Sequence, residues 1–153
     1  MKGIFSIILT GLWTFLSAQS LQEDIHTLLD DWHQAAAVAD EDSFFDAMTQ
    51  DAVYVGTDEV EVWSRDELRE WSKKYFERET AWDFKRKTRH LYYPNENADI
   101  AWFDETLDTW MGVCRGSGVV VKTDKGWKIK HYVLSVAVPN DKIRDYLELF
   151  HKS

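Results

Sequence analysis

The spacing of apolar residues changes once along the chain. From Leu21 to residue 78, apolar side chains recur every three or four positions, the period of amphipathic helices. This spacing predicts helices over residues 21–40, 41–50 and 64–78, and a short strand over 51–58. Ser64 is followed three residues later by Glu67, the pattern of a capping box, so the third helix should begin at Ser64.

From residue 81 onward the period is two, which is typical of half-buried strands. Four strands are predicted, over residues 81–93, 98–107, 111–123 and 127–138, and the tail over 140–153 favours a last helix. Helices followed by an antiparallel meander indicate an α+β domain, with the helices packed on one face of a curved sheet.

The first eighteen residues resemble a secretory signal peptide. Lys2 is followed by an apolar run from Ile4 to Leu16 and by small residues that end at Ala18. The run is shorter than the roughly 20 residues that span a bilayer. We therefore predict cleavage after Ala18, a single domain over 19–153 without a stable membrane span, and a secreted or periplasmic location. An uncleaved membrane anchor is the alternative.

Composition and charge limit which classes of partner are expected. The chain has 153 residues and a formal net charge of -9, and its only basic run is the short stretch from Lys85 to Arg89. Nucleic acid is therefore not expected as a partner, because a polyanion is bound by a basic face. Cys114 is the only cysteine, so no intrachain disulfide can form.

Four motifs carry a family resemblance, and they fall within residues 24–141: "GTDEVEVW", "ADIAWFDE", "RGSGVVV" and "GWKIKHYVLSVAVPN". The chain resembles the SnoaL-like domain family of the nuclear transport factor 2 (NTF2-like) superfamily. The resemblance implies a cone in which three N-terminal helices pack in a strongly curved antiparallel sheet around an apolar cavity. It also implies that fold alone does not decide function, since the superfamily includes cyclases, isomerases, dehydratases and association domains.

Two hairpin registers decide which polar side chains face this cavity. A three-residue loop from Asp124 to Gly126 would oppose Val119 to His131, Ser117 to Val133 and Arg115 to Ser135. A turn at Asp108 and Thr109 would pair Trp102 with Arg115 and Asp104 with Val113. Opposed residues share a face, and the face with Trp127 and Ile129 is the more apolar one. We therefore expect six side chains to line the cavity: Trp102, Asp104, Arg115, Ser117, His131 and Ser135.

These residue types suggest proton-transfer chemistry. Asp104 or His131 would move the proton, and Arg115 would hold an anionic oxygen. Trp102, Ser117 and Ser135 would contact the ligand, together with His33 from the first helix and Tyr54 from the first strand. The alternatives are a structural ion pair between Asp104 and Arg115, a hydrogen-bonded core role for His131, a satisfied or exposed His33 and a packing role for Tyr54.

No metal or other cofactor is expected. The acids Asp58, Glu59 and Glu61 lack the ligand spacing of a calcium loop. Residues His26, His90 and His151 are too scattered for a zinc site.

The prediction is thus an exported protein that binds a small apolar or amphipathic molecule. One alternative is a proton-transfer isomerase, cyclase or dehydratase of the ketosteroid-isomerase type, so whether the protein is an enzyme stays open. The other is a homodimeric interaction module that pairs through the outer face of its sheet, where Phe103, Tyr132 and Leu134 are expected.

Overall fold

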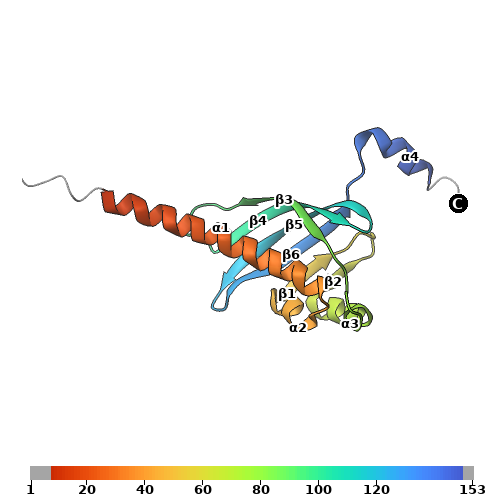
Figure 1. Cartoon of the computed structure of the whole chain (residues 1–153), viewed down its shortest axis with the longest axis horizontal. Coiled ribbons are helices and arrows are strands. Elements are labelled where there is room, and N and C mark those ends of the chain that lie inside the picture. The colour runs from red at the N-terminus through yellow and green to blue at the C-terminus, as the bar shows by residue number, and fades with distance from the viewer. Residues whose placement is uncertain (1–7, 150–153) are drawn as a thin grey trace, which may run out of the picture.

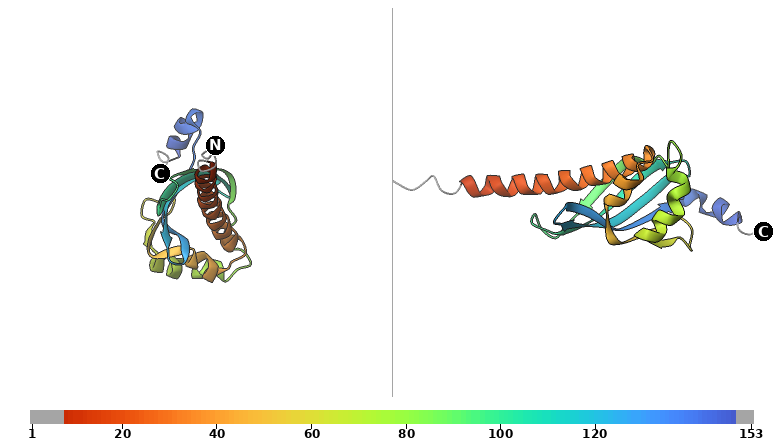
Figure 2. Two further views of the ribbon diagram at one scale, coloured as in Figure 1. Left: turned by 90° about the vertical axis from the view of Figure 1, so that its left-hand side faces the viewer. Right: turned by 90° about the horizontal axis from the view of Figure 1, so that it is seen from below.

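The C-terminal part of one long helix packs inside the curve of a six-stranded sheet, and the N-terminal part of the helix extends beyond the sheet (Figures 1 and 2). The computed structural model describes residues 8–149, with their side chains from Leu21 onward. The helices are α1 (Ile8–Ala37), α2 (Glu41–Asp46), α3 (Arg65–Phe76) and α4 (Ile143–Glu148), with a 3-10 turn at Asn140–Lys142. The strands are β1 (Met48–Val55), β2 (Val62–Ser64), β3 (Lys85–Tyr92), β4 (Ile100–Thr109), β5 (Gly112–Thr123) and β6 (Gly126–Val136).

The strands lie in the order β2-β1-β6-β5-β4-β3. All neighbours are antiparallel except β1 and β6, which are parallel, with Tyr54 beside Tyr132. The predicted α+β class and the NTF2-like arrangement of helices and sheet are confirmed. The short strand β2 and the parallel pair were not predicted.

Local sequence sets the start of α3. The Ser64 hydroxyl accepts from the Glu67 backbone N–H, and the Glu67 carboxylate accepts from the Ser64 backbone N–H, which confirms the capping box. The second helix ends earlier than predicted, because residues from Met48 onward enter β1.

The core lies between α1, α2 and the inner face of the sheet. From α1, Ile25, Leu29 and Trp32 are buried, and the short helix α2 adds Phe44 and Phe45. Gly116 on β5 makes room for the ring of Tyr132, which is part of this core. A Cβ atom at Gly116 would lie 2.2 Å from the Tyr132 hydroxyl oxygen, so only glycine lets that ring lie across β5.

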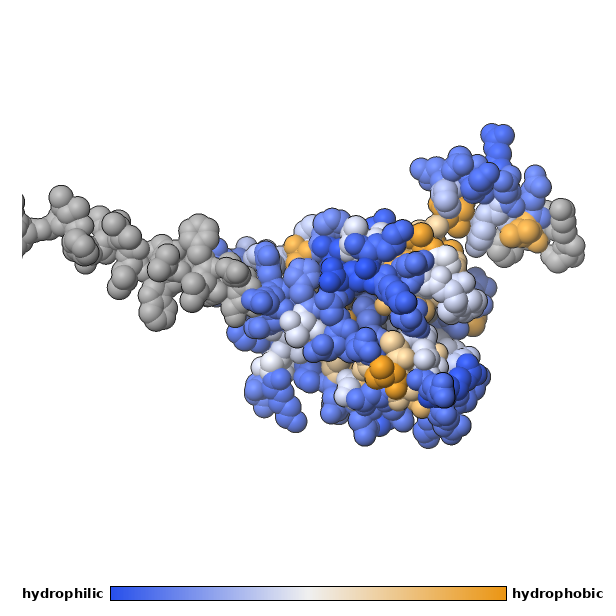
Figure 3. Space-filling view, in the orientation of Figure 1, coloured by the Kyte–Doolittle hydropathy of each residue, from blue (hydrophilic) through white to orange (hydrophobic). Residues whose placement is uncertain are grey.

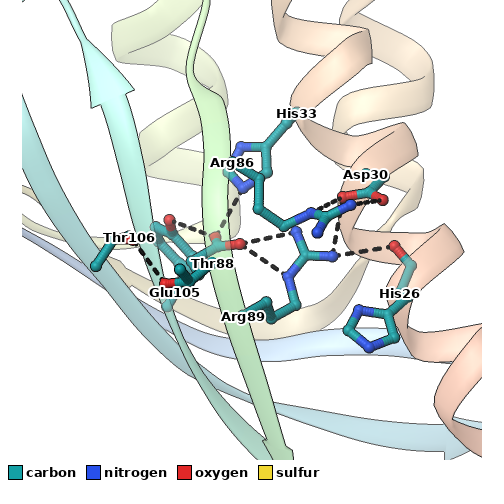
Figure 4. A network of polar contacts seen from close by, with 9 residues as sticks. His26, Asp30, His33, Arg86, Thr88, Arg89, Glu105 and Thr106 are labelled. Atoms are coloured by element: carbon teal, nitrogen blue, oxygen red, sulfur yellow. Dashed lines mark hydrogen bonds and ion pairs between the residues drawn. The ribbon is translucent and has the colours of Figure 1, made fainter.

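A buried polar network joins α1 to the sheet (Figure 4). At its centre is Glu105 on β4, which is fully buried. The carboxylate Oε1 accepts from His33 Nε2 at 2.7 Å and from the Tyr132 hydroxyl at 3.1 Å. The second oxygen, Oε2, accepts from Arg89 Nε at 2.9 Å and lies 2.7 Å from Arg89 Nη2.

Arg89 extends the network back to α1. Its side chain is fully buried, and Nη1 donates to the His26 carbonyl oxygen at 3.1 Å and to Asp30 Oδ1 at 2.9 Å. Asp30 also accepts two hydrogen bonds of 2.9 Å from Arg86. Helix, edge strand and sheet are therefore tied together by charges that each have a partner, as buried charges require.

The network keeps Glu105 ionised. Burial alone would raise the pKa of this carboxyl, but the hydrogen bond from His33 and the charge of Arg89 outweigh it, so the pKa lies below its usual value. Burial and the Glu105 charge raise the pKa of Tyr132, so its hydroxyl remains a donor.

The N-terminal prediction falls largely outside this description. Residues 1–7 are not described, and no side chain before Leu21 is, so the predicted signal peptide over residues 1–18 stays a prediction. Among the residues that are described, none of the helices has the length and apolar content needed to cross a membrane.

Replacing Glu105 should destabilise the fold in a pH-dependent way. Glu105→Gln leaves Arg89 with one acidic partner fewer in the core, and we expect a loss of about 3 kcal/mol in the free energy of unfolding at pH 7. A lowered native pKa means that Glu105 stabilises the fold above its unfolded pKa and that this contribution disappears as pH falls through the native pKa. The difference between wild type and variant, measured by urea unfolding, should therefore shrink in acid.

The matched control is Asp104→Asn, one residue away on the opposite face. Asp104 pairs with Arg115, whose side chain is largely exposed, so its loss should cost less than about 1 kcal/mol. Equal costs for the two variants would contradict the role given to Glu105.

Candidate ligand-binding site

An aromatic cavity of about 360 Å³ opens beside α3. Its walls come from β1, the β1–β2 loop, β2, α3, the segment before β3, the β4–β5 turn and β6. Six rings form a continuous arc in which neighbouring centroids lie 4.6 to 6.4 Å apart: Tyr54, Trp63, Trp71, Tyr75, Trp82 and Phe84. Trp110 and Met111, on the β4–β5 turn, add to the lining.

The position of α3 explains much of this arc. Its capping box begins directly after Trp63. Trp71 and Tyr75 follow four residues apart, so they lie on one face of the helix. The capping box of Ser64 and Glu67 thus sets where α3 begins, and α3 carries two of the six rings.

Two acids are the charged residues of the cavity wall: Asp58 and Glu61, both on the β1–β2 loop. The Asp58 backbone N–H donates to Glu61 Oε2 at 3.2 Å, and Asp58 Oδ1 accepts from the Val60 N–H at 3.1 Å. A Cβ atom at Gly56 would lie 2.2 Å from Glu61 Oε2, so glycine allows this carboxylate to lie against the main chain. The loop thus holds both carboxylates beside the aromatic arc.

Tyr54 forms the inner end of the arc. It is buried, and its ring stacks on Tyr132 with centroids 5.4 Å apart. Burial and the charge of Glu61 raise its pKa, so at neutral pH its hydroxyl is protonated and can donate a hydrogen bond.

The six strand residues predicted to line the cavity share one face of the sheet, but it is the outer face. Trp102 is 46% exposed and Arg115 and Ser135 are also exposed, whereas the neighbouring residues Phe103 and Glu105 are buried. Asp104, Ser117 and His131 lie on the same outer face. The predicted inward orientation is therefore wrong for all six residues.

A β-bulge explains the error. The predicted pairs of Arg115 with Ser135, Ser117 with Val133 and Val119 with His131 are confirmed, yet Val120 pairs with Ile129, which leaves Lys130 as an extra residue. A bulge reverses the side on which later residues point. Trp127 and Ile129 face inward as expected, but His131, Val133 and Ser135 face outward.

The other hairpin turns at Trp110 and Met111, later than predicted. Asp104 therefore pairs with Ser117 and Trp102 with Val119. Relative to the prediction, the β4–β5 pairing is shifted by an even number of residues. Each β4 residue therefore has a different partner on β5, but both still point to the same face of the sheet.

Asp104 forms the predicted pair with Arg115, at 3.2 Å, but on the outer face. It also accepts from the Tyr92 hydroxyl at 2.9 Å, and His90 Nδ1 lies 3.3 Å away. Burial opposes ionisation, but these hydrogen bonds and the charges of His90 and Arg115 lower the pKa of Asp104. This is the structural ion pair considered as an alternative.

Of the remaining two predicted residues, Tyr54 lies in the wall of this cavity and His33 does not. Tyr54 lines the aromatic cavity, as expected. His33 is buried and bonded to Glu105, and the hollow it borders is a separate one with Asp30 and Arg86. Sequence reasoning missed Trp63, Trp82 and Trp110 as cavity residues, and a high local density of tryptophan was the available signal.

Among the described residues, no group of three or more His, Cys, Asp and Glu side chains lies close enough to hold a metal ion. Cys114 is a buried free thiol on the inner face.

Comparison with solved structures supports the fold. An NTF2-like protein of unknown function from Pseudomonas putida KT2440 matches with a TM-score of 0.65 and 13% identity, over 81% of this chain and 92% of that chain. A protein described as a candidate NTF2-like dehydratase from Streptomyces avermitilis matches with a TM-score of 0.64 and 15% identity, over 76% and 96%. A candidate scytalone dehydratase from Novosphingobium aromaticivorans matches with a TM-score of 0.65 and 11% identity, over 80% of this chain and 87% of that chain.

No curated protein matches the sequence significantly. The family of SnoaL-like domains, in contrast, matches residues 25–139. This range contains the three packed helices from Ile25 onward and all six strands. The chain therefore belongs to the SnoaL-like domain family.

Proposed function

We propose that this protein binds a small apolar or amphipathic molecule in the cavity beside α3. The observation that carries the proposal is the continuous arc of aromatic rings around about 360 Å³ of space. Cavities that hold small ligands have volumes of about 300–1,000 Å³, with mostly apolar walls and a few polar groups. Burial of apolar ligand surface against these rings would supply the affinity.

Binding without chemistry is favoured over proton transfer. The residues predicted to move a proton, Asp104 and His131, lie outside the cavity. Both oxygens of Glu105 are occupied by protein donors. An isomerase, cyclase or dehydratase working in this cavity would have to use Asp58 or Glu61 as its base. The dehydratase neighbours are at most 15% identical, so they support the fold and not the activity.

A neutral fluorescent probe tests the proposal. The fluorescence of N-phenyl-1-naphthylamine should rise when the wild-type protein is added, because the dye brightens in apolar surroundings. Trp71 lines the cavity and is 39% exposed, so Trp71→Ala should weaken dye binding about tenfold without unfolding the protein.

Trp102→Ala is the matched control, because Trp102 has a similar exposed fraction of 46% and lies on the outer face. It should leave dye affinity unchanged. A loss with Trp102→Ala and none with Trp71→Ala would place the ligand on the outer face and contradict the proposal.

We also propose that the chain forms a homodimer through the outer face of its sheet. The residues first expected there, Phe103, Tyr132 and Leu134, are buried on the inner face, so that expectation is wrong. The outer face instead presents the exposed ring of Trp102, its cross-strand neighbour Val119 and, further along β6, Val133. Exposed apolar side chains that lie together on a surface are typical of protein interfaces.

A charge placed at the centre of this face should separate the subunits. Val119→Arg would bury an unpaired guanidinium in the interface, so light scattering after gel filtration should show a monomer where wild type shows a dimer. The control Val38→Arg adds the same charge at an exposed position of the α1–α2 loop and should remain dimeric. A monomeric wild type would contradict the dimer.

We further infer that residues 1–18 direct export. Expressed with its own N-terminus in a Gram-negative host, the protein recovered from the periplasm should begin at Gln19 when its N-terminus is sequenced. An uncleaved chain would contradict this inference.

A further inference from the structure

The cavity has charge of only one sign. Two acids lie in its wall, and none of its described lining residues is Lys, Arg or His. We propose that the ligand is an organic cation whose quaternary or methylated ammonium group sits among the rings of the arc, beside Asp58 and Glu61. This inference rests on the proposed binding function and names the chemical class of the ligand.

The ring arc suits a cation. The face of an indole or phenol ring carries negative charge density and attracts ammonium groups within about 6 Å of its centroid. Rings of this arc already do so within the protein. Lys74 Nζ lies 5.0 Å from the Tyr75 centroid and 5.9 Å from that of Trp71, and Arg78 lies 4.7 Å from that of Tyr75. Neither cation belongs to the cavity wall.

The two carboxylates lack a cationic partner. Within the part of the chain whose side chains are described, neither Asp58 nor Glu61 forms an ion pair, and both carboxylates accept hydrogen bonds from main-chain N–H groups of their own loop. A carboxylate beside an apolar wall attracts a positive ligand and repels a negative one.

Other ligand charges fit less well. An anion would meet two carboxylates and no basic side chain of the wall. A neutral apolar ligand would bury its surface against the rings, but it would remove water from the carboxylates without replacing the lost hydrogen bonds. A cation with methyl groups satisfies both the rings and the acids.

A pair of probes with the same shape separates charge from burial. Choline and 3,3-dimethylbutan-1-ol differ by the exchange of a positive nitrogen for a carbon atom. Titration of each into the full protein, followed through the indole N–H signals in two-dimensional NMR, should give choline at least tenfold the affinity of the alcohol. The shifted signals should be those of Trp63, Trp71 and Trp82.

Two variants in the β1–β2 loop test the acids. Glu61→Gln keeps the size of the side chain and an oxygen that can accept from the Asp58 N–H, and it should lower choline affinity about fivefold without changing that of the alcohol. Glu59→Gln removes the same charge from the same loop, at an exposed residue outside the cavity wall, and should change neither affinity.

The outcomes distinguish this inference from the proposed function. Equal affinities for the two probes, or equal losses in Glu59→Gln and Glu61→Gln, would overturn the cation inference and leave the binding function standing. Failure of both probes and of the neutral dye to bind would overturn the two together.

Discussion

A carboxylate that is wholly removed from water can stay ionised only if each of its oxygens accepts hydrogen bonds or faces a positive charge. Glu105 meets this condition through His33 of α1 and Arg89 of the edge strand β3 (Figure 4). Tyr132 of the inner strand β6 is its third partner. If any one of these elements shifted relative to β4, it would lose its contact with the Glu105 carboxylate. The position of α1 inside the curved sheet follows from this constraint.

The constraint also divides the interior into two regions. The polar groups nearest α1 are used in holding the fold together, and the rings of Trp32, Tyr54 and Tyr132 pack against one another beside them. The aromatic cavity is lined by other side chains, those near α3 and the β1–β2 loop. The surface on the side of α1, by contrast, is mostly hydrophilic, with small apolar patches (Figure 3). The buried polar network and the two acids of the cavity wall thus belong to different parts of one small domain.

The sequence was sufficient for the main helices and strands, but not for the short strand β2 or for the cavity lining. The helical period, the alternation in the strands and the Ser64 capping box are local signals, and each predicted its element. Facing direction depends on a single extra residue, Lys130, and alternation alone does not show where a strand bulges. Glu105 was not among the residues predicted to face inward, because a charged residue is buried only when distant partners such as Arg89 are in place.

The parallel pairing of β1 with β6 has a consequence for how the chain folds. Strand β6 lies in the middle of the sheet, yet it is the last strand to be synthesised, and residues 56–125 separate it from β1. Such distant pairings are slow to form, because a long loop must close before any contact compensates for its entropy. The meander of β3, β4 and β5 can assemble early, but the edge formed by β1 and β2 can join only after translation has passed residue 136. The cavity wall that contains Tyr54 is therefore completed last.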